Sequence, residues 1–397
     1  MHNEESISHH TIKNLLTRDF VFGFLAFFAF LTAFSAIIPT LPIFLARLGS
    51  NEREIGVLIG ISGVSSLISR FLVGGALMRY SEKSVMMFGA LLFALTFLAF
   101  FVLRPFWPFF AVRLLQGIAI ACIDTAAFAL IINTIPLASR GQGIGYLLLA
   151  PPLSLAIVPS FSISLINQYS FTVLFLSCTG MSLCSLFLSG KVKGQETTTP
   201  DKDTPSHGTL FLEWKIVAPA TTSFLQAFVW GALITFFPLY AIQCGIRNPG
   251  HFFSAIAIML IMGRALGGRI VDNYSKEKII LTFICTGMIT MVILSFSRTL
   301  PMFIVVGLLW GTGHAFFVPA SMTYSFEHAG SSGGTAVGTF RAFSDLGQAL
   351  GPMVMGIIVP LTGYRTMFLC LALICLINLG YFQFYVRKKG KCGTHGS

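Results

Sequence analysis

Long apolar stretches, separated by short polar connections, dominate the pattern of the chain. Each is about as long as a membrane-spanning helix, which needs about 20 predominantly apolar residues. Twelve such stretches can be delimited in the sequence. They cover residues 20–46, 54–78, 84–103, 107–132, 140–165, 169–189, 215–242, 250–272, 277–297, 300–325, 333–361 and 364–386. The pattern therefore predicts a polytopic membrane protein with twelve transmembrane helices.

The same pattern argues against a β-barrel. Strands of a membrane barrel alternate apolar and polar residues over about ten positions. Residues 20–34 and 91–101 instead carry apolar side chains on every side. The predicted fold class is therefore an all-α membrane protein.

Composition narrows the class of protein further. Hydrophobic residues make up 55% of the 397 residues and charged residues only 10%, a balance foreign to soluble domains. The phosphate-binding sequence GxxxxGK[ST] is absent, so ATP-driven function is not expected. The sequence HExxH is absent too, and the eight cysteines lack metal-ligand spacing. We therefore predict neither an enzyme nor a bound cofactor or metal.

The positive charges predict the orientation in the membrane. The formal net charge is +11, and every lysine falls in a segment on the same side as the N-terminus. Because basic residues concentrate in cytoplasmic loops, both termini are predicted to be cytoplasmic, in the cell (inner) membrane. Topology and contact with anionic lipid account for the charge, so no nucleic-acid partner is expected.

A polar segment divides the chain into two similar halves. Residues 190–214 are rich in Thr, Pro, Asp and Lys and read as a cytoplasmic linker. At one constant offset, Arg70, Gly74 and Gly117 align with identical residues of the second half. The predicted organisation is an N-terminal tail (1–19), two six-helix bundles related by an internal repeat (20–189 and 215–386) and a basic cytoplasmic tail (387–397). Such repeats are typical of transporters that work by alternating access.

Two spans contain short motifs that allow a comparison. The first span ends in Pro39-Thr40-Leu41-Pro42, and the fourth contains Arg113-Leu114-Leu115-Gln116-Gly117. These motifs resemble those of the major facilitator superfamily, and within it the bacterial drug:proton antiporter branch. The resemblance covers the whole chain. It implies a transporter of small molecules in which Arg113 borders a central cavity and takes part in proton coupling.

The resemblance also implies a cytoplasmic gate. The family's loop motif has an arginine, a glycine four residues later and an aspartate four residues after that. The second half matches it with Arg264, Gly268 and Asp272, whereas the first half has Arg70 and Gly74 but Met78 at the aspartate position. By resemblance, Asp272 latches the cytoplasmic side by docking at a helix N-terminus. Alternatively, these charges only enforce topology.

Charged residues inside the predicted spans are candidates for proton coupling, because a charge in the membrane needs a cavity or a partner. Arg113 and Asp124 are eleven residues apart and share one face of a helix, about 16 Å apart along its axis. Asp345 is either a protonation site or the local counter-ion of Arg341, one turn away. Arg113 and His314 could likewise serve only in helix packing.

The substrate cavity is expected to be lined by neutral polar and aromatic residues of the spans. The candidates are Phe34, Gln116, Gln226, Trp230 and Trp310. The leading hypothesis is a monomeric secondary transporter that exports a small amphiphilic or cationic compound in exchange for protons. The alternatives are a proton-coupled importer of a small metabolite and a membrane sensor or scaffold that does not transport.

Overall fold

The computed structural model describes residues 17–103, 106–135, 140–193, 213–329 and 333–387. These residues form helices and no strands. In chain order, the helices are α2 (Arg18–Arg47), α3 (Glu52–Leu77), α4 (Glu82–Val102), α5 (Phe106–Thr134), α6 (Arg140–Gln168), α7 (Phe171–Lys191), η2 (Trp214–Ile216), α8 (Val217–Gln243), α9 (Gly250–Asn273), α10 (Lys276–Phe296), α11 (Leu300–Ala329), α12 (Gly333–Tyr381) and η3 (Phe382–Val386). The predicted all-α fold class is confirmed.

Local sequence explains where several helices begin. Asn51 precedes α3, and its side chain accepts a hydrogen bond from the amide of Glu54 at 3.0 Å, while the Glu54 carboxylate accepts from the Asn51 amide at 3.3 Å. Ser81 and Ser170 accept in the same way from the first turns of α4 and α7. Such caps satisfy amides that have no partner within the helix. They place the polar connections at the ends of the apolar stretches.

The described helices have the length and composition needed to cross a membrane. Ten of those in the described part are long and apolar enough, and the described apolar part of α9, Gly250–Arg264, is shorter. The last two predicted spans are joined within α12, where Gly363 interrupts the helical backbone with a φ of 80°. Glycine adopts this left-handed region without steric strain. The count of twelve spans stays a prediction.

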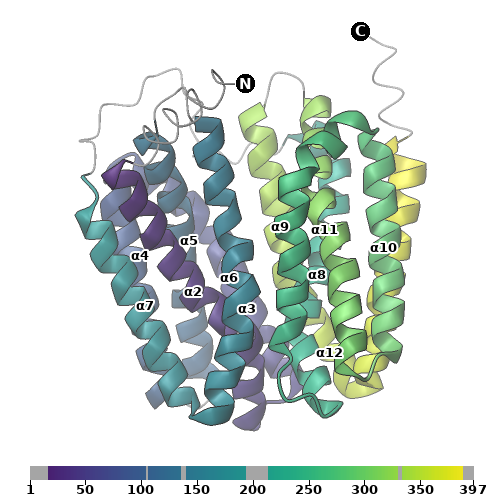
Figure 1. The fold of residues 1–397 in the computed structure, drawn as a ribbon, viewed down its shortest axis with the longest axis horizontal. Coiled ribbons are helices and arrows are strands. Elements are labelled where there is room, and N and C mark those ends of the chain that lie inside the picture. Colours follow the sequence, from purple (N-terminus) through teal and green to yellow (C-terminus); the bar gives the residue numbers. More distant parts are fainter. Residues whose placement is uncertain (1–16, 104–105, 136–139, 194–212, 330–332, 388–397) are drawn as a thin grey trace, which may run out of the picture.

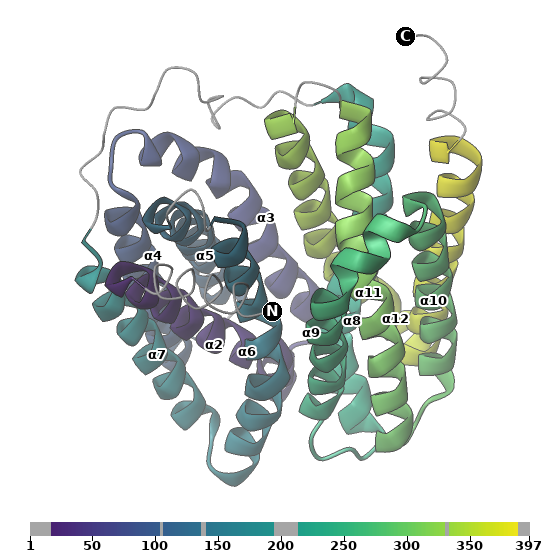
Figure 2. The same ribbon diagram turned by 45° about the horizontal axis from the view of Figure 1, so that its top comes forward.

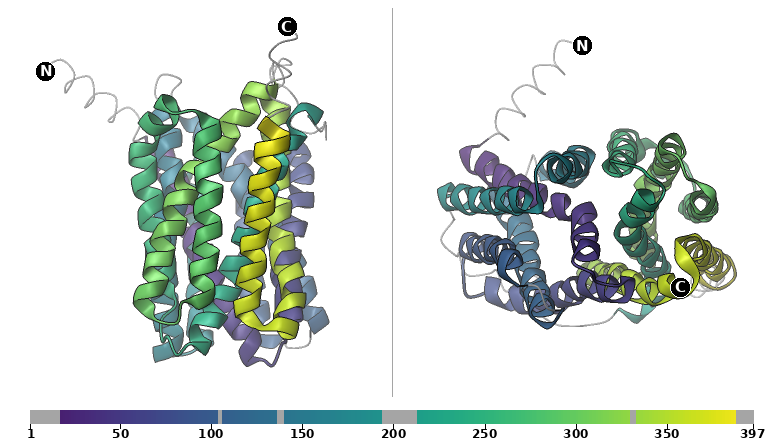
Figure 3. Two further views of the ribbon diagram at one scale, coloured as in Figure 1. Left: turned by 90° about the vertical axis from the view of Figure 1, so that its right-hand side faces the viewer. Right: turned by 90° about the horizontal axis from the view of Figure 1, so that it is seen from below.

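The helices form two groups that lie side by side (Figure 1), α2–α7 in one and α8–α12 in the other. In the view with the end at which α2 begins and η3 ends turned forward (Figure 2), the groups appear as separate sets of helices. Seen from the opposite end (Figure 3), α3 and α12 run next to each other at the boundary. We call the end at which α2 begins and η3 ends the terminal end, and the opposite end the far end.

The two groups pack together mainly near the far end. Along the α3–α12 contact, glycine replaces side chains with backbone: a Cβ on Gly56 would collide with the carbonyl of Pro352, and one on Gly356 with that of Glu52. Small residues allow helices to approach this closely. In the connection before α9, the Asn248 side-chain amide donates to the carbonyl of Ser160 in α6 at 3.0 Å. This end of the boundary is therefore closed by direct contact.

Candidate functional site: a charged cavity between the helix groups

A cavity of about 280 Å³ lies between the two groups. Its walls come from α2, α3 and α5 in the first group and from α8 and α12 in the second. The lining residues are Phe30, Leu31, Phe34, Ile37, Ile38, Leu41, Ile59, Ser62, Gly63, Ser66, Arg70, Arg113, Ile120, Asp124, Gly231, Ile234, Thr235, Asp345, Gln348, Ala349 and Pro352. This volume is near the small end of the range of ligand pockets, about 300 to 1,000 Å³.

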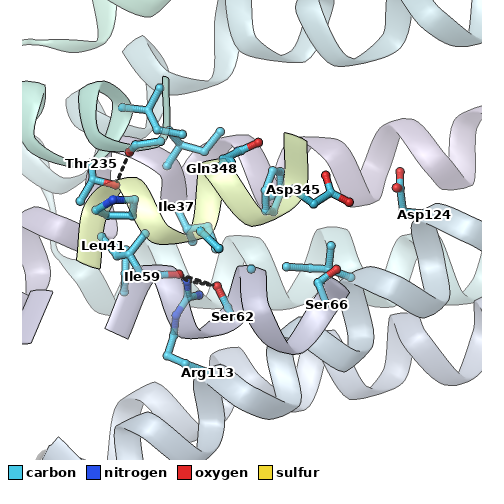
Figure 4. Close-up of a pocket in the computed structure, with 18 of the residues that line it drawn as sticks. Ile37, Leu41, Ile59, Ser62, Ser66, Arg113, Asp124, Thr235, Asp345 and Gln348 are labelled. Atoms are coloured by element: carbon cyan, nitrogen blue, oxygen red, sulfur yellow. Dashed lines mark hydrogen bonds between the residues drawn. The ribbon is translucent and has the colours of Figure 1, made fainter. Parts of the chain in front are cut away.

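The lining changes character along the cavity (Figure 4). At one side of the view lie Leu41 and Ile59 with Thr235, and at the other side lie the carboxylates of Asp345 and Asp124. The apolar side is next to the α3–α12 contact at the far end, which we call the far-end seam, because Pro352 both lines the cavity and lies against Gly56. The cavity is therefore amphipathic, with its carboxylates toward the terminal end.

Three charged side chains meet at this polar side. The Arg70 Nη2 atom of α3 lies 2.9 Å from Oδ2 of Asp124 in α5, and its Nε atom lies 3.4 Å from Oδ2 of Asp345 in α12. Each of the three side chains is about a quarter to a third exposed. Arg70 thus joins a carboxylate of its own group to a carboxylate of the other group.

The two carboxylates are not held equally. The Arg70–Asp124 contact has the length of a charge-assisted hydrogen bond. The contact with Asp345 is longer, and the buried Nε atom of Arg70 makes no hydrogen bond. Within the described part of the chain, no hydrogen bond to the Asp345 carboxylate is present. Asp345 is therefore the less satisfied carboxylate of the cavity.

Arg113 lines the same cavity but is held entirely within the first group. Its Nε atom donates to the Leu58 carbonyl at 2.7 Å, and Nη2 donates to the Ile59 carbonyl at 3.3 Å and to Ser62 at 2.5 Å. Its Nη1 atom donates to Gln116. A Cβ on Gly117 would collide with the Ser62 carbonyl, so only glycine lets α5 and α3 approach this closely. These contacts favour a packing role for Arg113.

Only some of the residues predicted from the sequence line the cavity. Asp124, Asp345, Arg113 and Phe34 line the cavity, as does Arg70, which the sequence had placed at the gate. Arg113 and Asp124 share this cavity, as their spacing on one helix face predicts.

Arg341 makes no direct ion pair with Asp345 in this structure, so the contacts do not favour the local ion pair considered in the sequence. Its guanidinium carbon lies 5.9 Å from the ring centre of Phe128, a residue of the other group. Asp345 has its ionic contact with Arg70 instead.

Besides Arg341, four candidates of the second group lie outside the cavity lining. Trp230, Trp310 and His314 stack on one another, with ring centres 5.3 to 6.3 Å apart. Gln226 is buried near them, since a Cβ on Gly287 would meet both Gln226 and Trp310. Gln226, Trp230 and Trp310 do not line this cavity, and a role for them in binding substrate stays a prediction. Gln116 is buried and acts through its contact with Arg113 rather than lining the cavity.

The gate candidates are only partly visible. Gly74 lies in α3 and Arg264 is an exposed residue of α9. Gly268 and Asp272 belong to α9, but the surroundings of Gly268 and the side chain of Asp272 lie outside what the structure describes, so the latch stays a prediction.

Sequence reasoning missed three polar lining residues: Ser66, Thr235 and Gln348. The spacing of polar residues in the sequence could have identified Ser66. Ser62, Ser66 and Arg70 follow each other at intervals of four, which places them on one helix face. From this shared helix face, Arg70 could have been predicted to line the cavity rather than the gate.

Comparison with known proteins decides the family. A family model described as the Major Facilitator Superfamily matches residues 23–347 and 261–392. The chain belongs to the major facilitator superfamily. Members of this family are transporters rather than enzymes, and the fold and the cavity between helix groups agree with that class.

Curated relatives are exporters and drug-resistance proteins. The chain is 23% identical over 374 residues to the multidrug resistance protein MdtG of Serratia proteamaculans (strain 568), covering 90% of this chain and 91% of the relative. It is 23% identical to the staphylopine export protein of Staphylococcus aureus (strain Mu50 / ATCC 700699), covering 83% and 86%. A solved structure, the nucleoside transporter NupG, superposes with a TM-score of 0.77 at 14% identity, covering 93% of this chain and 98% of that chain. This last likeness concerns the fold alone.

Proposed function

We propose that this protein is a proton-coupled secondary transporter that exports a small amphiphilic or cationic compound by alternating access. In this proposal twelve spans form two six-helix bundles, residues 20–189 and 215–386, in the inner membrane with both termini cytoplasmic. The terminal end then faces the cytoplasm, and the conformation described above is inward-facing, with its far end closed. The exporter direction is supported by the relatives named for export and drug resistance.

The observation that carries the proposal is the Arg70–Asp124–Asp345 cluster at the boundary between the groups. Two carboxylates contact a single guanidinium, and Arg341 acts on Asp345 only from further away, so one negative charge at this side of the cavity lacks a contacting cation of its own. Burying such a charge is unfavourable unless a partner neutralises it. A proton or a cationic substrate can supply the missing positive charge, and the two then compete for the same position.

Asp345 is the proposed coupling residue of this cluster. It lacks a hydrogen bond within the described residues and belongs to the second group, whereas Asp124 and Arg70 belong to the first. Protonation of Asp345 removes its attraction to Arg70 and so loosens a contact between the groups. In this way the occupancy of one carboxylate can change the relative stability of two conformations. The coupling roles of Arg113, Arg341 and His314 remain predictions that the contacts do not favour over packing.

A reconstituted transport assay tests the proposal. Proteoliposomes carrying a pH-sensitive dye are exposed to amphiphilic cations and to neutral and zwitterionic compounds, with and without an imposed pH gradient. The wild type is expected to move protons only when a transported compound is present. Asp345→Asn should abolish this proton movement, whereas Glu327→Gln, an exposed carboxylate at the terminal end, serves as the matched control.

Other outcomes contradict the proposal in distinguishable ways. Uptake of a compound together with protons, rather than against them, would indicate the importer. Binding of a compound without movement of compound or protons would indicate a sensor or scaffold. Proton movement retained by Asp345→Asn at the wild-type rate would remove Asp345 from the coupling site.

A further inference from the structure

A second hollow lies on the outer surface of the first group, away from the cavity. It has a volume of about 430 Å³ and runs between α3 and α4, with α5 as its floor. Its lining includes Val73, Tyr80, Val85, Phe88, Ile118 and Cys122, none of which lines the central cavity. Apart from the hydroxyls of Ser69, Tyr80 and Ser84, the lining side chains are apolar or weakly polar. We call this hollow the α3–α4 groove.

The groove has a buried floor and exposed rims. Val73 and Cys122 are 4% and 5% exposed, whereas Leu72 and Phe88 at the rims are 72% and 58% exposed. The rims lie on helices with the length and apolar composition of membrane spans, so lipid chains are the medium in contact with them. A groove that is apolar, open to lipid and recessed in its floor can hold a single chain in a fixed position.

The groove fits within one leaflet. Along α3 it extends from Ser69 to Ala76, seven residues or about 10 Å at the rise of an α-helix, and Tyr80 continues it into the α3–α4 connection. One leaflet contributes about 15 Å, half of the hydrocarbon core. An acyl chain lying in the groove would therefore run its length in one leaflet and present its headgroup at the α3–α4 connection.

The charge at that connection favours an anionic headgroup. Arg79 is exposed and makes no ion pair within the described residues. The neighbouring charges are engaged elsewhere: Lys83 donates to the carbonyls of Gly190 and Val192 at 2.8 and 2.9 Å, and Glu82 accepts from Asn133 at 3.0 Å. A free guanidinium at the headgroup level suits a phosphate, which it can bind with two parallel hydrogen bonds.

We propose that the α3–α4 groove binds one acyl chain of an anionic phospholipid from the leaflet at the terminal end, with its phosphate at Arg79. The lipid lies against a face of α3 that adjoins the one lining the cavity, since Ser69 and Val73 line the groove while Ser66 and Arg70 line the cavity. The site is independent of the substrate and of its direction of transport.

Photolabelling of the full-length protein in nanodiscs tests the site. The probes are phosphatidylglycerol and phosphatidylcholine that carry a diazirine in the acyl chain, and labelled residues are mapped by peptide mass spectrometry. Phosphatidylglycerol should label residues 72–88 and 118–122 at least threefold more than the surface around Leu95, an exposed residue of α4 outside the groove. Its advantage over phosphatidylcholine in the groove should be about fivefold, the effect expected of one basic residue near the headgroups.

Two kinds of variant separate the groove from general lipid contact. Val73→Trp fills the groove and should reduce its labelling to that of the Leu95 surface. Arg79→Gln, an exposed substitution that leaves the packing intact, should abolish the preference for phosphatidylglycerol, whereas Arg53→Gln at the far end should not. Equal labelling of the groove and of the Leu95 surface would overturn the proposal. A preference that persists in Arg79→Gln would overturn the assignment of the headgroup.

Discussion

Arg70 and Arg113 line the same cavity, yet they are bound in opposite ways. Arg113 donates only to groups of α3 and α5, within one helix group, and two of its acceptors are backbone carbonyls. Arg70 contacts two carboxylates, one in each group. If the groups move relative to each other, all partners of Arg113 move with it. Arg70 keeps Asp124, which belongs to its own group, but separates from Asp345 in the other group. An arginine in a transporter cavity is therefore not by itself evidence of coupling, and its partners decide its role.

The largest effect is expected from Arg113→Ala. The substitution leaves the Leu58 and Ile59 carbonyls and the Gln116 side chain without their donor in a buried site, which should lower the free energy of unfolding by about 3 kcal/mol or more. Thermal unfolding in detergent, compared with the matched Arg70→Ala, measures it. A larger loss of stability in Arg70→Ala would reverse the comparison.

Asp345→Asn should affect transport rather than folding. The amide mimics the protonated carboxyl, so exchange of compound across the membrane should persist while uphill transport driven by a pH gradient falls at least tenfold. Counterflow and gradient-driven uptake in the same proteoliposomes separate the two activities. Loss of both activities together with loss of folded protein would show that Asp345 is structural.

The ion pair between the groups should have a modest energy. The Arg70–Asp345 contact is 3.4 Å long and both side chains are partly exposed, so a double-mutant cycle with Arg70→Gln and Asp345→Asn should give a coupling of about 1 kcal/mol. Thermal stability of the four proteins supplies the cycle. The same cycle between Arg70 and Glu327, which pairs with Lys276, should give none. A coupling of zero for Arg70 and Asp345 would mean that the pair does not link the groups.

The smallest effect concerns one of the acceptors of Arg113. Ser62→Ala removes the hydroxyl that accepts from Nη2 and should destabilise the protein by about 1 to 2 kcal/mol. Ser66, one turn further along α3, makes no hydrogen bond within the described chain, so Ser66→Ala is the matched control and should leave thermal stability unchanged. Equal effects of the two substitutions would argue against the specific role of Ser62.

The sequence could predict the helices because their length and hydrophobicity are local properties. The predicted break between residues 361 and 364 coincides with Gly363, where the backbone of α12 leaves the helical conformation. Arg113 and Asp124 were also correctly placed on one surface, since helix geometry alone fixes their relation. The two-bundle repeat, the linker and the orientation in the membrane remain predictions.

Contacts between helices could not be predicted in the same way. The spacing of Arg341 and Asp345 permits a local pair, but the pair that forms depends on where α3 lies, and Arg70 is far away in the chain. The stack of Trp230, Trp310 and His314 likewise depends on how helices pack against each other and not on local sequence. These helices are apolar on most sides, so their sequences do not show which side faces the cavity and which faces a neighbouring helix.

The glycine contacts at the far end affect whether water and protons can pass between the two helix groups. Where Gly56 meets Pro352 and Gly356 meets Glu52, backbone touches backbone and not even a methyl group fits between them. A continuous file of water molecules therefore cannot pass along this seam, and protons cannot hop through it. Under the proposed proton coupling, a carrier that leaves its carboxylates accessible from one side must not short-circuit the proton gradient. The insulation at this seam would then come from residues that have no side chain at all.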